Sequence, residues 1–168
     1  ASARSALRSH PNATTRWALG LFLANAWQPH DHSNTRPMSD IDLSREIAAE
    51  AVDAAGGADR ACADLVVLLA RGHRYARTGD RNEHLRRARD LYAGLHARAL
   101  ASGDGDIAAT ALNHQVDAEL EMAVGDRGTR LREGIKKVEY ARTLARMPTR
   151  IAEIEISIAW HMTQLADF

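Results

Sequence analysis

Two amphipathic segments joined by a short turn constrain the fold of this 168-residue chain most strongly. Apolar side chains recur at three- and four-residue steps through residues 65–76 and again through residues 85–99. Such spacing places them on one face of an α-helix. The turn Gly79-Asp80 separates the two segments, and a diverged copy of it, Gly125-Asp126, follows 46 residues later. The pattern therefore predicts a repeated helix pair and an all-α fold.

The composition is typical of a folded chain. Hydrophobic residues make up 45% of the sequence, charged residues 26%, and prolines number only 4, which excludes a disordered chain. Lysine plus arginine and aspartate plus glutamate both number 22, so the chain has no net charge. Nucleic-acid binders usually carry a basic excess, and we do not expect a nucleic-acid partner. The arginine-rich runs at 81–89 and 127–137 are interleaved with acids, as on a solvated helix face.

The single cysteine bears on where the protein works. Cys62 cannot form an internal disulfide, so the expected location is a reducing cytoplasm, with the thiol packed rather than reactive. The apolar stretch 17–27 is too short to cross a bilayer, and no membrane association is expected. The sequence begins at Ala1 without methionine, which predicts a processed protein or a fragment of a longer one.

Seven main helices are expected, separated by turns rich in glycine, proline or aspartate. Gly56-Gly57 should end one helix, and Pro148 should stop another, with Thr149 capping the last. Residues 154–158 alternate like a strand, but isoleucines at helical spacing and the lack of a second strand candidate favour a helix. The expected ranges are approximately 14–24, 39–55, 59–77, 82–102, 107–124, 129–147 and 149–166.

A small residue, an aromatic residue and a glycine mark the end of one segment, and a small, an aromatic and an apolar residue recur in the next. These are Gly72, Tyr75 and Gly79, then Ala88, Tyr92 and Leu95. In this spacing the chain resembles the tetratricopeptide repeat family, although its period exceeds the usual 34 residues and Glu121 occupies an aromatic position. The resemblance implies a single domain over 1–168, a right-handed α-solenoid of antiparallel helix pairs with about three and a half repeats. They would span 14–57, 58–103, 104–148 and the half-repeat 149–168.

In that family the first helix of each repeat lines a concave groove. The resemblance therefore implies a protein-interaction module that binds a peptide or a partner domain there. The alternative is a regulatory sensor module of a larger bacterial signalling or transcription protein, with a small ligand in the groove; a closed apolar pocket would favour it. His73 and Glu119 replace the carboxylate clamp of some relatives, so a neutral or basic segment is the expected ligand. The implied groove residues are Asn25, His73, Ala76, Gln115, Glu119 and Met122.

Candidate metal ligands gather only in the loop at residues 28–37. His30 and His32 flank Asp31 and could chelate a divalent ion, but only His10, without a supporting spacing, offers a third ligand. A polar surface loop is the simpler interpretation. No phosphate-binding, dinucleotide-binding or paired-cysteine motif occurs in the sequence. We therefore expect no cofactor, no resident metal and no enzymatic activity.

The last expected helix is too apolar for the solvated end of a repeat array. One of its sides should pack on the preceding helices through a stripe of isoleucines. The other side, with Ile156, Trp160 and Met162, should remain uncovered. Uncovered apolar patches mark interfaces. The sequence predicts either a homodimer through this helix or a longer parent chain whose next helix covers it.

Overall fold

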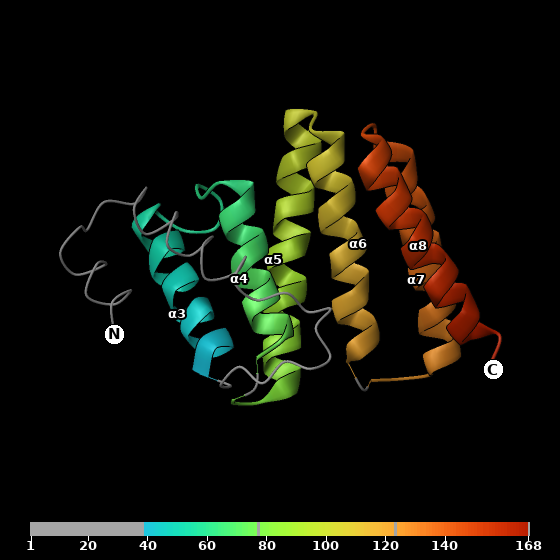
Figure 1. Ribbon diagram of the computed structural model, residues 1–168, viewed down its shortest axis with the longest axis horizontal. Helices are drawn as coiled ribbons and strands as arrows, with labels where there is room; N and C mark the ends of the chain where they lie inside the picture. Colours follow the sequence, from blue (N-terminus) through green and yellow to red (C-terminus); the bar gives the residue numbers. More distant parts are fainter. Residues whose placement is uncertain (1–38, 77, 123, 168) are drawn as a thin grey trace. The chain divides into compact units, whose positions relative to one another are not determined.

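The computed structural model describes residues 39–76, 78–122 and 124–167, and these residues form six α-helices and no strand (Figure 1). The predicted all-α class is confirmed for this part of the chain. The first expected helix, 14–24, lies outside the described residues, so the seven-helix solenoid stays a prediction. The helices are α3 Ser39–Ala54, α4 Ala63–Arg74, α5 Arg81–Ser102, α6 Gly105–Glu121, α7 Arg127–Leu144 and α8 Pro148–Leu165.

The described residues divide into two compact units, one ending at His84 and the other beginning at Leu85. Within the first unit, α3 packs against α4. Within the second, α7 packs against both α6 and α8, and α6 also contacts α8. None of the described helices is long and apolar enough to span a membrane. The predicted repeat boundaries concern the whole chain and stay predictions.

The end of α3 follows the sequence closely. Its last buried side chain, Val52, is followed by Gly56 and Gly57 with φ of +88° and +102°. Glycine tolerates these left-handed values because it has no Cβ. The N–H of Gly57 donates to the carbonyl oxygen of Val52 at 2.9 Å, which closes the helix. The predicted glycine cap is confirmed.

Helix α4 is shorter than the predicted range 59–77. The N–H groups of Arg60 and Ala61 turn back to the carbonyl oxygen of Gly57, so regular helix begins only after Cys62. Cys62 is exposed, and the expectation of a packed thiol is wrong, because the residue precedes the helix rather than lying on its buried face. Gly72 gives close packing of α4 on α3, since a Cβ there would lie 2.9 Å from Cβ of Arg45.

Helix α5 carries the predicted apolar stripe, and α6 begins one short turn after it. The buried side chains of α5 are Leu85, Ala88, Tyr92, Leu95 and Ala99. Gly103, with φ of +76°, ends α5, and the carboxylate of Asp104 accepts the N–H of Ile107 at 3.0 Å. An N-terminal aspartate satisfies one of the free N–H groups of a new helix.

The junction between α7 and α8 differs from the prediction. Helix α7 ends at Leu144, and Pro148 is the first residue of α8, with Met147 rather than Thr149 at its cap. Proline suits this position because the first helical turn has no partner for an N–H group. Pro148 therefore starts a helix and does not stop the preceding one.

An apolar cluster joins α6, α7 and α8 within the second unit. Gly134 of α7 packs closely against α6, because a Cβ at this position would lie 3.0 Å from Cγ1 of Val116. Small residues at such positions let neighbouring helices approach closely. The buried members come from α6, from α7 with its C-terminal cap, and from α8, and they are Ala109, Leu112, Val116, Val138, Ala141, Ala145 and Ile154.

Candidate functional site

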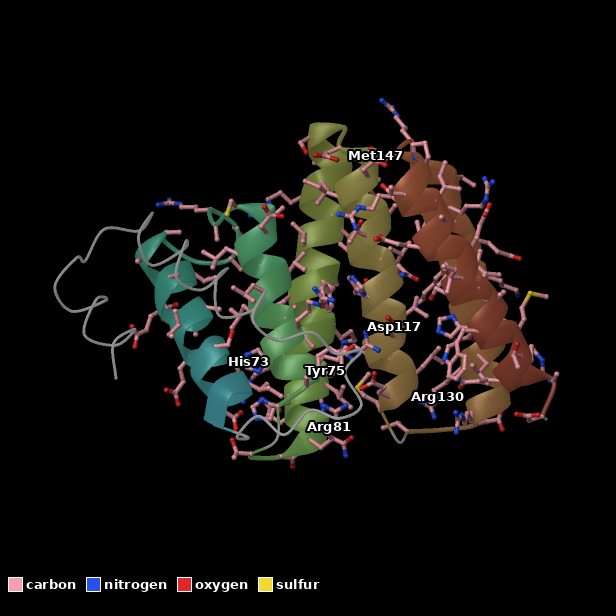
Figure 2. The ribbon with its side chains drawn as sticks, viewed as in Figure 1. His73, Tyr75, Arg81, Asp117, Arg130 and Met147 are labelled. Carbon is pink, nitrogen blue, oxygen red and sulfur yellow. The ribbon has the colours of Figure 1, made fainter. Side chains whose placement is uncertain are left out.

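The predicted groove residues of the first unit are buried and already engaged. Ala76 and His73 (the latter labelled in Figure 2) are both buried. Nδ1 of His73 lies 2.9 Å from Nδ1 of His84. Nε2 of His84 lies 2.9 Å from the carbonyl oxygen of Thr78, which can only accept. A hydrogen bond to this carbonyl requires a proton on Nε2 of His84, and in that neutral tautomer the bare Nδ1 would accept from His73. Asn25 lies outside the described residues.

The groove residues of the second unit make contacts of their own. Gln115 donates to Oε1 of Glu119 at 2.8 Å, and Nζ of Lys137 lies 2.6 Å from Oε2 of the same carboxylate. Glu119 thus joins α6 to α7. Met122 follows the end of α6 and offers its carbonyl oxygen to Arg130. The structure brings Gln115 and Glu119 together, whereas His73 and Ala76 belong to the other unit.

Arg130 of α7 binds the C-terminal end of α6, a contact that the sequence analysis did not predict. Its guanidinium, projecting from α7 toward the end of α6 (Figure 2), donates to the carbonyl oxygens of Glu119 at 3.1 Å, Leu120 at 3.3 Å and Met122. The last carbonyl groups of a helix have no partners within it, and a cation there also opposes the helix dipole. Helix α6 has no basic residue in its own last turn, which is the only sequence signal for this contact.

A second group missed at the sequence level surrounds Asp117 of α6. Nε2 of His161, from α8, lies 3.4 Å from one carboxylate oxygen of Asp117, and Nδ1 of His114 lies 3.6 Å from the other. The ring of Tyr92 packs against that of His114, with centroids 5.4 Å apart. His161 is only 3% exposed. The cluster therefore links α8 to α6 inside the unit.

No group of three or more His, Cys, Asp or Glu side chains within the described ranges could hold a metal ion. The loop with His30 and His32 lies outside those ranges. In the described part of the chain, backbone N–H groups of Met147 and Arg146 lower the pKa of Asp106, and hydrogen bonds from Thr129 lower that of Asp126. The shift at Asp126 reflects capping of α7, and the shift at Asp106 reflects its contact with the segment before α8.

Helix α8 presents the most exposed apolar side chains of the described helices. Ile156 is 70% exposed, Trp160 62% and Met162 56%, whereas Ile154 is 1% exposed. Ile156 and Trp160 are one turn apart and share a face, while Met162 projects about 200° around the helix from Trp160. We define the outer face of α8 as a row of exposed residues at helical spacing: Thr149, Ala152, Glu153, Ile156, Trp160 and Thr163.

Comparison of the chain with known proteins gives no match. No family model, no curated protein and no solved structure matches the chain. The resemblance to tetratricopeptide repeats therefore stays a prediction, and function must be inferred from the surfaces of the molecule itself.

Proposed function

We propose that the chain is a protein-interaction module that binds a partner protein through the outer face of α8. The observation that carries this proposal is the exposure of Ile156 and Trp160 one turn apart on the same helix. Transfer of such a side chain out of water contributes about 1.5–3 kcal/mol. Tryptophan is also enriched among the residues that contribute most to protein interfaces.

The side of α8 opposite the outer face is anchored to α6 and α7. Ile154 is inserted in the core cluster, and His161 faces Asp117. Two polar contacts join α8 to α7: Arg127 donates to Gln164 at 2.8 Å, and Arg142 pairs with Glu155 at 2.9 Å. A preorganised surface loses little conformational entropy when it binds. These contacts support α8 as a ready-made docking element.

The predicted groove residues are less suited to first contact with a partner. His73 is buried against His84, and Glu119 is bound by Lys137. A partner would have to displace these contacts, and substitutions such as His73→Asp or Glu119→Lys would perturb the unit as well as any binding. The outer face of α8 requires no such displacement.

Site-specific photocross-linking tests the proposal. Benzoylphenylalanine would replace Trp160 in the full chain expressed in its native host, and, as a control, would replace Asp53, which is exposed on α3. We expect a covalent protein adduct from position 160 and none from position 53. If position 160 gives no adduct under conditions where the protein is folded, the outer face of α8 is not the contact surface.

A further inference from the structure

We propose that the partner of the outer face of α8 is a second copy of the same chain, which packs against it antiparallel. This inference rests on the proposed function, since it names the partner of that surface. It is carried by three properties of the face: its shape, its register and its charge.

The shape of the outer face permits close approach of an identical helix. Ile156 and Trp160 project from its centre, and the neighbouring positions hold the small residues Ala152 and Thr163. Helices pack when the projecting side chains of one enter the gaps of the other, at axial separations of about 8–10 Å. The large side chains and the small neighbours of one copy therefore complement those of another.

The register follows from twofold symmetry, which is the commonest arrangement of identical chains. An axis passing midway between Ile156 and Trp160 sets Ile156 of each copy against Trp160 of the other. The same operation sets Thr149, in the first turn of α8, opposite Asp167, which follows the end of α8. Both ends of the outer face are then covered.

Charge selects the antiparallel orientation. Arg146 lies just before α8, Arg150 in its first turn pairs with Glu153 at 2.7 Å, and exposed Asp167 lies just beyond its C-terminal end. The helix dipole adds positive character to the first end and negative character to the second. Antiparallel packing brings the basic end of one copy to the acidic end of the other. Parallel packing would set Glu153 beside Glu153 and Asp167 beside Asp167.

The size of the face sets the expected affinity. Helix α8 has 18 residues and a length of about 27 Å. We expect a contact limited to one such helix from each copy to bury less than the roughly 1,600 Å² of a standard stable complex. We therefore expect a dimer that dissociates in the micromolar range, with dimer predominating only at high protein concentration.

Sedimentation equilibrium of the full chain between about 1 and 200 μM measures the association. We expect Ile156→Asp and Trp160→Ala to weaken dimerisation at least tenfold. Met162→Asp is the matched control, because Met162 is also exposed but projects from a different side of α8. Unchanged helical circular dichroism shows that each variant is folded. A monomer over the whole concentration range, or equal weakening by Met162→Asp, would overturn the proposal.

Disulfide trapping tests the orientation. Cys62 is the only cysteine, and Cys62→Ser supplies a thiol-free background. In that background, Thr149→Cys protein mixed with Asp167→Cys protein should give a mixed disulfide dimer, since the two positions face each other. Thr149→Cys alone should give none, because the two copies of residue 149 would lie about 27 Å apart. A disulfide between two copies of residue 149 would show parallel packing and contradict the arrangement.

The photocross-linking experiment separates this inference from the proposed function. An adduct at position 160 with twice the mass of the chain and only its own peptides supports both. An adduct only with a different protein overturns the second copy as partner and leaves the interaction module intact. The absence of any adduct overturns both.

Discussion

Single aspartates join the elements of the second unit at their turns. Asp104 and Asp126 cap α6 and α7 through the N–H groups of Ile107 and Thr129. Asp106 accepts the N–H of Arg146 at 2.8 Å and that of Met147 at 2.9 Å, so it ties the start of α6 to the segment before α8. These carboxylates act as hydrogen-bond acceptors in the charged form.

The first prediction concerns acid stability. The folded state lowers the pKa of Asp106 and of Asp126, so their contribution to stability is fully present above the unfolded value of about 3.9 and is lost as the pH falls further. Asp106→Asn should lower the urea midpoint at pH 7. The difference between the variant and the parent should shrink as the pH falls through the lowered pKa of Asp106, because the parent side chain then becomes neutral. A difference that persists unchanged in acid would refute the charged role of Asp106.

Gly105 and Gly94 should respond to alanine substitution in opposite directions. A Cβ at Gly105 would collide with the carbonyl oxygen of Leu144, whereas a Cβ at Gly94 would meet open space. Gly105→Ala should therefore cost about 1–3 kcal/mol, as overpacking does. Gly94 lies inside α5, and Gly94→Ala should stabilise by about 0.5–1 kcal/mol. Chemical denaturation measures both values, and equal effects of the two substitutions would argue against the α6–α7 contact.

At the scale of elements, α8 has two faces of opposite character. Ile154 is 1% exposed and Ile156 is 70% exposed, only two residues apart. Ile154→Ala should cost about 2–5 kcal/mol because it leaves a cavity in the core. Ile156→Ala should change the stability of the monomer by less than about 0.5 kcal/mol. Urea unfolding at submicromolar concentration checks both, and a costly Ile156→Ala would show that this face is covered within one chain.

The junction of α6 and α7 depends on Arg130. Its contacts to the last carbonyl groups of α6 are charge-assisted, and their loss should cost about 1–3 kcal/mol. Arg130→Met would keep much of the aliphatic packing and remove the donors. Arg132→Ala, at an exposed position of the same helix, is the control and should stay within about 0.5 kcal/mol of the parent. Similar losses from both variants would mean that Arg130 has no special role.

At the scale of the whole molecule, helix dominates. The six described helices account for more than half of the 168 residues, well above the roughly one-third of an average soluble protein. Far-ultraviolet circular dichroism of the full chain should therefore report more than half helix. A helical fraction below one half would mean that at least one of these helices does not form in solution.

Tyr92 illustrates how far periodicity alone reaches. Its position in the stripe of α5 predicts burial, and its side chain is fully buried. Tyr75, the aromatic residue of the preceding segment, follows the end of α4, is half-buried, and has the guanidinium of Arg74 over its ring. Helix ends depend on caps and neighbours, whereas helix middles depend on the repeat of apolar residues.

The sequence by itself determined the helical class, the bounds of α3 and α5 within one residue, and the glycine turn at Gly56-Gly57. It also separated Ile154 from Ile156 on α8. These features are local, because a glycine or an apolar stripe acts through its immediate neighbours along the chain. Residues 154–158 are helical despite their strand-like alternation, because the apolar residues at helical spacing extend over a longer segment.

Only the tertiary structure decided the roles of Arg130, Asp117 and Pro148. Arg130 contacts residues of α6 and its C-cap that lie 8 to 11 positions away in the sequence, and His161 of α8 lies 44 positions from Asp117. No periodicity encodes which two helix faces meet. Pro148 is equally compatible with ending one helix or starting another, and the N–H groups of Arg146 and Met147, bound by Asp106, fix the second outcome. Contacts between elements, not the elements themselves, carry this information.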